Sequence, residues 1–458
     1  MKNLAILIFS ISLVFACSPQ VKEDNDVSIT GTITNPKGET VTFTHGELQV
    51  IDTLNEFGAF AAKIDLNKAG RIRFKHGDEI GYLYAHPGDQ ISFTLDTDLF
   101  DETLVFEGDA ADVNNYLAAM TLLNDSLISY QDMMMLEEED FIKTQDSIND
   151  LKISYLKDVL DKEFVAETKE DLYWDTYKER LDYEGSHEYY LQIPLEDFNV
   201  SDGFYSFITE LNINDSSKLE NRSFKRYVRG LVRYVSSEIR QSDNSISYYE
   251  GYSQAVDSVV SLKPLKTELI LDVVIQSYAY MPEDFRTELI EKWKSWSPDP
   301  EALSKMDKLI KSWSKLAKGQ PAPNFAYESL DGDTLTMDNF KGSVLYIDVW
   351  ATWCGPCIGE HPAMEKLQEQ FKDQNVTFLA VSIDDTKEPW KKMVATKELG
   401  GVHVFAPGAW NAQIIEDYMI QGIPRFILID QDGNIVDATA QRPSGNIAED
   451  IEALLNPV

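Results

Sequence analysis

The sequence predicts a multidomain α+β protein with an antiparallel β-sandwich-like domain at 27–108, an all-α region at 109–318 and an α/β domain at 319–458. Three observations predict this architecture. Short stretches separated by Gly, Pro, Asn and Asp fill the first part, which is typical of a small sandwich. Apolar residues recur at helical spacing in the second part. Strand-like and helix-like segments alternate in the third, and 458 residues accommodate about three domains.

The elements of the first two parts follow from their apolar patterns. In the stretch 28–34, Ile29, Gly31 and Ile33 share one face of a strand. Further strands are predicted at 40–45, 48–54, 57–66, 71–76, 80–85, 90–95 and 103–108. Helices are predicted near 112–136, 140–162, 166–183, 222–240, 264–280 and 300–317. Neither part contains a cluster of residues that indicates chemistry, so we interpret them as scaffold, docking or partner-selecting modules.

The third part begins with a linker, Gly319–Pro323, and a hairpin at 325–337 around Asp331-Gly332, a pair that suits a tight turn. Strands are then predicted at 344–350, 376–384, 402–405, 425–430 and 435–440. Helices are predicted after residue 354 and around 389–398, 410–418 and 446–455. This order is a βαβ unit followed by a hairpin and a helix.

The strongest indication of chemistry is the pair Cys354 and Cys357. The pair lies between the apolar run Val344–Trp350, a predicted strand, and the helix predicted after it. The first turn of a helix has unpaired N–H groups and a partial positive charge, which stabilise a thiolate and lower the pKa of a thiol. Cys354 can therefore attack a disulfide of another protein, and Cys357 can resolve the mixed disulfide. The spacing predicts dithiol redox chemistry.

Two other interpretations of the cysteine pair are weaker. A zinc site needs about four ligands, but the six histidines are scattered and no second C-x-x-C occurs, so no metal site and no cofactor are predicted. A purely structural disulfide would not require the Trp, Gly and Pro that surround the pair.

The N-terminus predicts export. Residues 1–16 resemble a signal peptide whose apolar core is shorter than the roughly 20 residues of a membrane-spanning helix. The sequence Val14-Phe15-Ala16-Cys17 resembles a bacterial lipobox, which implies lipid attachment at Cys17 and a flexible tether at 17–26. An ordinary secretory peptide, or a buried Cys17, is the alternative. The predicted location is the cell envelope, facing the periplasm, with the membrane contacted through the lipid anchor.

The net charge of −36 argues against nucleic acid or an anionic membrane surface as a main partner. A hydrophobic content of 43% is sufficient for well-packed cores. The cysteine pair instead indicates other proteins with disulfides as partners.

WCGPC (353–357) together with GIPRFILID (422–430) resembles the thioredoxin fold. The lead-in at 319–325 and the sequence CGPCIGEHP (354–362) resemble the TlpA/ResA branch of the AhpC/TSA–thioredoxin-like superfamily, which are thiol–disulfide oxidoreductases of the envelope. The upstream regions resemble, more loosely, the N-terminal extensions of such lipoproteins in Bacteroidetes-like bacteria. The resemblance implies a thioredoxin fold for 319–458.

The resemblance also implies roles for individual residues. Cys354 matches an exposed nucleophile and Cys357 a buried resolving thiol. Pro424 matches a cis-proline that leaves the Ile423 backbone free to pair with an extended substrate. The implied substrate contacts are Trp353, Gly355, Pro356, Ile423 and Pro424.

Two carboxylates complete the predicted site. Asp348 matches the buried aspartate of thioredoxins, whose raised pKa lets it accept the proton of Cys357. Many TlpA-type proteins have another residue there. Glu360 matches a glutamate that the ResA branch places near the cysteines, although a glutamate is also favoured in the first turns of any helix.

The predicted function is reduction of disulfides in envelope proteins. The Gly-Pro pair matches thioredoxin, which is a reductant at about −270 mV, whereas DsbA is an oxidant at about −120 mV. A reductant in the oxidising periplasm must itself be reduced again after each reaction, which implies a membrane thiol-reducing relay of the DsbD or CcdA kind. Apocytochrome c, and hence cytochrome c biogenesis, is one candidate substrate. The alternatives are a disulfide oxidase or isomerase, and a binding or assembly lipoprotein with a secondary redox domain.

Overall fold

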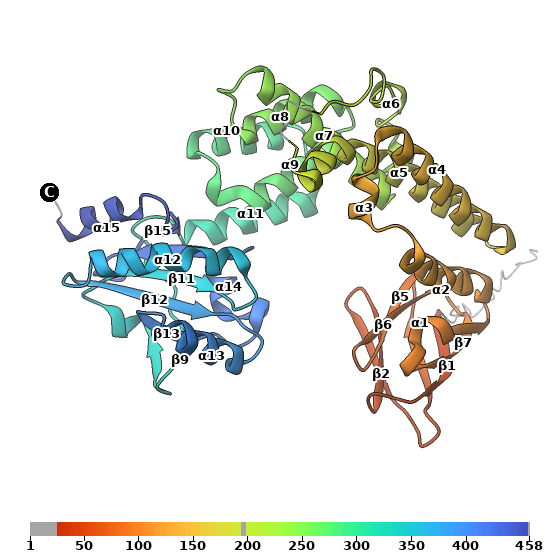
Figure 1. Cartoon of the computed structure of the whole chain (residues 1–458), viewed down its shortest axis with the longest axis horizontal. Coiled ribbons are helices and arrows are strands. Elements are labelled where there is room, and N and C mark those ends of the chain that lie inside the picture. Colours follow the sequence, from red (N-terminus) through yellow and green to blue (C-terminus); the bar gives the residue numbers. More distant parts are fainter. Residues whose placement is uncertain (1–24, 194–197, 457–458) are drawn as a thin grey trace, which may run out of the picture. The chain divides into compact units, whose positions relative to one another are not determined.

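The computed structural model describes residues 25–193 and 198–456 (Figure 1). They form two compact units, one with the chain up to Ile213 and Ser217–Leu231, the other with Asn214–Ser216 and the chain from Val232 onward. Cys17, the signal peptide and most of the tether lie outside the described residues. Within the described ranges, no helix is long and apolar enough to cross a bilayer.

The first unit begins with a sandwich of two four-stranded sheets, whose orders are β4-β1-β7-β8 and β3-β2-β5-β6. Alternate residues of both sheets enter one shared core, as the predicted alternation requires. One pairing differs from the predicted antiparallel arrangement, because β1 and β7 run parallel. The strands are β1 (Asp26–Thr34), β2 (Thr40–His45), β3 (Leu48–Thr53), β4 (Ala59–Asp65), β5 (Gly70–His76), β6 (Glu79–Ala85), β7 (Gln90–Asp96) and β8 (Val105–Gly108).

Helices follow the sandwich in the first unit. The stretch predicted as one helix at 112–136 is two, because Ser129 accepts a hydrogen bond from the Asp132 N–H and so caps a new helix. The helices are α1 (Phe100–Thr103), α2 (Ala111–Ser126), α3 (Tyr130–Met134), α4 (Glu138–Tyr155), α5 (Lys162–Leu191) and α6 (Phe207–Glu210), and α7 (Arg222–Ser242) is divided between the units.

The second unit starts with the end of α7 and four further helices, α8 (Tyr248–Val259), α9 (Lys263–Ser277), α10 (Glu283–Ser295) and α11 (Pro300–Ser314). Asp299 caps α11 by accepting a hydrogen bond from the Ala302 N–H at 2.8 Å. Trp313 near the end of α11 stacks on Tyr278, with ring centroids 5.8 Å apart. The helices from Val232 onward therefore form one compact body with the α/β fold.

The α/β fold contains a seven-stranded sheet in the order β10-β9-β13-β12-β11-β14-β15. Its three central strands β11, β12 and β13 are parallel, and β14, β15 and β9 pair antiparallel with their neighbours. The strands are β9 (Ala326–Ser329), β10 (Thr334–Thr336), β11 (Val344–Trp350), β12 (Val376–Ser382), β13 (Val402–Phe405), β14 (Arg425–Ile429) and β15 (Ile435–Ala440). Every residue of β11 is buried, as its apolar run, interrupted only by Asp348, predicts for a central strand.

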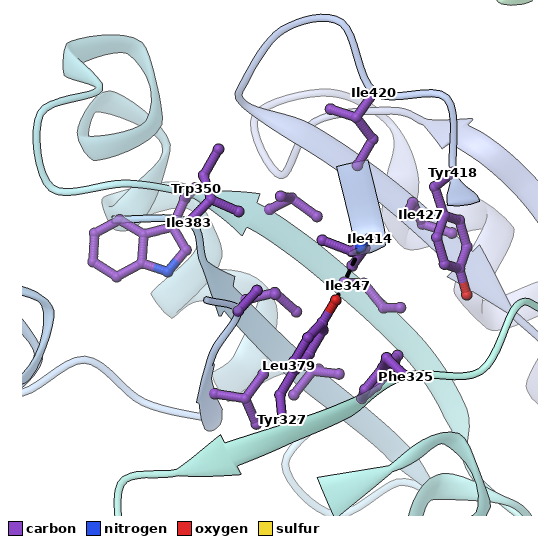
Figure 2. Close-up of a cluster of buried hydrophobic side chains, with 14 of the residues drawn as sticks. Phe325, Tyr327, Ile347, Trp350, Leu379, Ile383, Ile414, Tyr418, Ile420 and Ile427 are labelled. Atoms are coloured by element: carbon purple, nitrogen blue, oxygen red, sulfur yellow. Dashed lines mark hydrogen bonds between the residues drawn. The ribbon is translucent and has the colours of Figure 1, made fainter. Parts of the chain in front are cut away.

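Helices cover both faces of this sheet. One core contains Leu367 of α12 (Gly355–Gln370) and Ile451 of α15 (Ile447–Leu455). The opposite core contains Trp390 of α13 (Lys387–Lys397) and Ile414 of α14 (Gln413–Asp417). In this second core the Tyr327 hydroxyl accepts a hydrogen bond from the Ile414 N–H at 2.9 Å, beside Ile347 of β11 (Figure 2).

The predicted linker is held against the sheet. Gly319 N–H donates to the Ile435 carbonyl at 2.7 Å, and Ile435 N–H donates to the Gln320 carbonyl at 2.8 Å. Leu316 is buried in the same core as the strands. The end of α11 is consequently anchored to the α/β fold.

Candidate active site

The cysteine pair lies where the sequence predicts, between β11 and α12. Cys354 is the N-cap of α12, and Cys357 is in its first turn. The two sulfurs form a disulfide, with Cα atoms 5.3 Å apart. Cys354 Sγ also accepts a hydrogen bond from the Cys357 N–H at 3.2 Å. An unpaired N–H of the helix start therefore points at this sulfur.

The exposure of the two cysteines differs from what the resemblance implies. Cys357 is 1% exposed, as expected for a resolving thiol, but Cys354 is only 5% exposed. Both belong to the buried core on the α13 side of the sheet. Exposure at this turn comes instead from the neighbours Trp353, Gly355 and Pro356. The sequence prediction of an exposed nucleophile was thus wrong for this disulfide form, because Cys354 packs into the core.

A buried aspartate holds the turn that precedes the cysteines. Asp384 follows β12 and is 2% exposed. Its carboxylate accepts hydrogen bonds from the Thr352 N–H at 3.0 Å and the Thr352 hydroxyl at 2.6 Å. The Ser382 hydroxyl donates to its other oxygen at 2.8 Å. These bonds compensate for burying a carboxylate and fix the start of the Trp353–Cys357 turn.

Two exposed tryptophans lie beside each other at the surface of the site. Trp353 is 52% exposed and Trp410 is 44% exposed, and their ring centroids are 6.1 Å apart. Trp353 directly precedes Cys354, whereas Trp410 belongs to the short turn before α14. Large aromatic side chains left in solvent beside a reactive group are typical of a protein-binding surface.

The Ile423–Pro424 peptide bond is cis, as the resemblance implies. In the β11–β14 pairing, Arg425 lies opposite Val349, so the Pro424 loop and the turn after β11 leave the sheet at the same edge. Ile423 packs against the core that contains both cysteines. Within the described chain, its backbone N–H and carbonyl have no protein hydrogen-bond partner. An extended segment can pair with them.

Asp348 is buried in β11 and is 6% exposed. Its Oδ1 has no hydrogen-bond partner among the described residues. Burial, and secondarily the negative charge of Glu360, raises the pKa of Asp348 to about 8. A carboxyl group with such a pKa carries its proton for most of the time at neutral pH. Asp348 also lines a cavity of about 30 Å³ together with His361.

Glu360 lies on α12 and is 8% exposed. Its carboxylate accepts hydrogen bonds from the Ser444 N–H at 3.1 Å and the Ser444 hydroxyl at 3.0 Å. Arg442 Nη1 lies 3.6 Å from the same group. The loop after β15 therefore holds and orients the Glu360 carboxylate.

Within residues 25–193 and 198–456, no group of three or more His, Cys, Asp or Glu side chains could hold a metal ion. The candidate site contains a dithiol, an aromatic surface and a cis-proline loop, and two buried carboxyl groups lie on β11 and α12, the elements that flank the cysteine turn. This set can exchange a disulfide and move a proton.

Comparison with known proteins agrees with this chemistry. The Redoxin family model matches residues 317–455. Over 122 residues the chain is 32% identical to the thiol-disulfide oxidoreductase ResA of Bacillus thuringiensis subsp. konkukian, which covers 27% of this chain and 69% of that protein. The chain belongs to the ResA family of thiol-disulfide oxidoreductases. The α/β fold is the part of the chain that the Redoxin model matches, since the match begins at residue 317.

Two further proteins are similar to this chain over about the same share of its length. ResA of Halalkalibacterium halodurans is 30% identical over 139 residues, covering 30% of this chain and 77% of that protein. Among solved structures, the thioredoxin domain of a thiol-disulfide oxidoreductase from Bacteroides vulgatus is 31% identical, with a TM-score of 0.29, and covers 31% of this chain and 99% of that one.

Four residues around the site of this ResA-family chain were missed by sequence reasoning, namely Asp384, Trp410, Arg442 and Ser444. Each is separated from the cysteines by at least one strand. Only Asp384 carried a usable signal, because a carboxylate directly after a buried parallel strand faces the edge where the cysteine turn also lies.

Proposed function

We propose that this oxidoreductase reduces disulfides in other proteins through Cys354 and Cys357. The Cys354 thiolate attacks one sulfur of the partner disulfide, and the partner's second sulfur leaves as a thiolate. Cys357 then attacks Cys354 Sγ, which closes the intramolecular disulfide and releases the other partner thiolate. Two electrons pass to the partner, which then carries two thiols once its thiolates are protonated.

The observation that carries this proposal is the hydrogen bond from the Cys357 N–H to Cys354 Sγ at the start of α12. In the reduced protein the same donor, with the partial positive charge of the helix N-terminus, favours a thiolate at Cys354. The sulfur of Cys357 is more deeply buried, and Cys357 is not the N-cap residue of the helix. This asymmetry supports attack by Cys354 and resolution by Cys357.

Asp348 is the proposed proton acceptor for Cys357, acting through its ionised form, which is the minor form at neutral pH. Resolution requires a thiolate at Cys357, and a buried thiol has a raised pKa. A carboxyl with a pKa of about 8 is close to a thiol in proton affinity, so proton transfer between them costs little. The adjacent cavity of about 30 Å³ is large enough for a water molecule that could carry the proton onward. Glu360 is proposed to keep the pKa of Asp348 high.

The exposed surface of the site is proposed to bind the partner polypeptide. The unpaired backbone of Ile423, next to Pro424, supports strand-like pairing with an extended segment. Trp353, Gly355 and Pro356 are exposed in the turn that contains the cysteines. The Gly-Pro pair supports reduction over oxidation or isomerisation.

The proposed location is the cell envelope, with lipid attached at Cys17. A reductant in that oxidising compartment needs electrons from a membrane thiol relay of the DsbD or CcdA kind. Oxidised envelope proteins are the proposed substrates, and apocytochrome c is one of them.

A trapping experiment tests the function. In the Cys357→Ser variant, Cys354 should retain partner proteins as stable mixed disulfides in cells, and Cys354→Ser/Cys357→Ser should retain none. Recovery of envelope proteins that are reduced in wild-type cells and oxidised in the variant supports the proposal. No trapped partner, or partners that become more reduced in the variant, would contradict it, and full cellular function of the double variant would favour a binding or assembly role.

A further inference from the structure

A second cavity lies beside the Pro424 loop within the second unit. Its volume is about 490 Å³. One wall is the loop that contains Gln421, Ile423 and Pro424. The other wall comes from the end of α9 and the 3-10 turn Tyr278–Tyr280, with Trp313 of α11. The segment expected to bind substrate backbone therefore borders a pocket that the helices upstream of the α/β fold help to build.

Direct contacts hold the two walls together. Gln421 Nε2 donates a hydrogen bond to the Ile275 carbonyl at 3.1 Å. Tyr278 stacks on Trp313, and Trp313 packs against the core that contains the cysteines. Because α11 is also anchored through residues 316–322, the helical wall is a built part of the site.

The pocket contains an unusual cation. Arg425 lines it, directly follows Pro424 and is 5% exposed. Its guanidinium lies 5.6 Å from the Tyr280 ring centroid and 6.0 Å from the Trp313 ring centroid, both in the pocket wall. The charged end of Arg425 is therefore placed between the aromatic residues of the helical wall.

The hydrogen bonds of Arg425 are incomplete. Its Nη1 donates to the Ala438 carbonyl at 3.0 Å, but its buried Nε has no acceptor among the described residues. Asp437 lies near enough to act on it electrostatically, yet its Oδ1 accepts from the Thr439 N–H and hydroxyl. No ion pair to Arg425 occurs in the described part of the chain.

A buried guanidinium without a carboxylate is costly, and cation–π contacts offset only part of that cost. In a chain with 77 acidic and 41 basic residues, an unpaired buried arginine is not explained by a shortage of carboxylates. The other charged residue of the pocket is also an arginine, Arg442, whose side chain is 57% exposed. The pocket thus offers two guanidinium groups and no acidic side chain in its lining, although Arg442 also lies 3.6 Å from the Glu360 carboxylate.

We propose that this pocket binds a carboxylate carried by the polypeptide whose disulfide is exchanged, with Arg425 as its buried partner and Arg442 at its exposed side. This inference rests on the proposed function and adds a preference for acidic segments. Arginine suits the role because its planar fork matches the two oxygens of a carboxylate. The carboxylate can come from an Asp or Glu side chain or from a chain terminus.

Paired disulfide peptides test the proposal with the full-length reduced protein. The two peptides of a pair differ at one position, which is Glu in one peptide and Gln in the other. That position lies within two residues of a half-cystine, on its N-terminal or its C-terminal side. A further pair ends beside the half-cystine with a free or an amidated C-terminus. We expect the acid of at least one pair to react with a kcat/KM about tenfold higher, as one charge-assisted hydrogen bond of about 1.4 kcal/mol provides. The pair that responds identifies the source of the carboxylate.

Variants show whether the preference depends on Arg425. In Arg425→Met the ratio of acid to amide should fall to about one, and in Arg425→Lys it should be intermediate, because lysine keeps the charge but loses the fork. Lys318→Met removes an exposed cation that lines a neighbouring cavity and should keep the wild-type ratio.

Equal rates for acid and amide at every position in the wild-type protein would overturn the inference, and this comparison needs no variant. A preference that survives Arg425→Met would also overturn it. Both results leave the dithiol reaction intact, whereas failure to reduce any peptide would instead contradict the proposed function.

Discussion

Glu360 and Ser444 are joined by two hydrogen bonds, one from the Ser444 N–H at 3.1 Å and one from its hydroxyl at 3.0 Å. This pair ties α12, which carries Cys357, to the loop after β15. It also keeps a negative charge where it raises the pKa of Asp348. The buried carboxyl of the site is therefore controlled from a loop more than 80 residues away in the chain.

Replacing Glu360 by glutamine keeps the shape of the side chain and removes its charge. The pKa of Asp348 should then fall below about 8 but stay above the usual carboxyl value of about 3.9, because burial is its largest cause. NMR titration of the Asp348 carboxyl carbon measures this. Glu369→Gln, an exposed charge on the same helix, should leave the titration unchanged. An identical Asp348 pKa in Glu360→Gln would refute the coupling.

Asp348 should also make stability depend on pH. Below about pH 4 the carboxyl is protonated in both the folded and the unfolded protein. Between about pH 4 and 8 the unfolded chain loses this proton while the folded chain keeps it, so unfolding releases a proton and rising pH lowers stability.

The pH dependence can be measured as the free energy of unfolding of the wild type and of Asp348→Asn. Relative to the variant, the wild type should lose up to about 1.4 kcal/mol per pH unit across that window. Denaturant unfolding at several pH values checks it. Parallel curves for the two proteins would show that Asp348 has an ordinary pKa.

Asp384 should be a structural requirement of the cysteine turn. In Asp384→Ala, Thr352 loses the acceptor of two hydrogen bonds and Ser382 loses a third. The loss of stability should be about 2 kcal/mol or more, because bonds to a buried charge are lost. Asp385→Ala, which removes the exposed neighbouring carboxylate, should change stability by less than about 0.5 kcal/mol. Equal stabilities of the two variants would contradict this role.

The tryptophan pair should act on protein partners and not on the chemistry itself. Trp410→Ala should slow reduction of a protein disulfide by about fivefold or more, since interface tryptophans commonly contribute over 1 kcal/mol. The rate with a small-molecule disulfide should change little. Tyr189→Ala, which removes another exposed aromatic residue, serves as control. If both disulfides slow equally in Trp410→Ala, the surface has a structural role instead.

Local patterns predicted most of the elements but not all of their partners. The apolar run of β11 and the alternating stretches of the sandwich identify strands because burial imposes a period on the chain. The parallel pairing of β1 with β7 was not predictable in this way, since alternation reports which face is buried and not which strand lies alongside.

The same distinction explains the candidate site. Cys354, Cys357 and Pro424 were found because their chemistry is local to a short motif. Asp384 and Ser444 were missed because their roles depend on hydrogen bonds to residues 32 and 84 positions away. Arg425 follows Pro424 directly, yet only the aromatic walls from α9–α11 make it distinctive.

Reduction by this dithiol depends on Cys354 being an activated thiolate at the start of α12. The most direct test is a pH titration of the Cys354 thiolate, by ultraviolet absorbance or alkylation rate, in the reduced Cys357→Ser protein. We expect a pKa for this thiol well below the value of about 8.5 for free cysteine. A pKa at or above that value would contradict it.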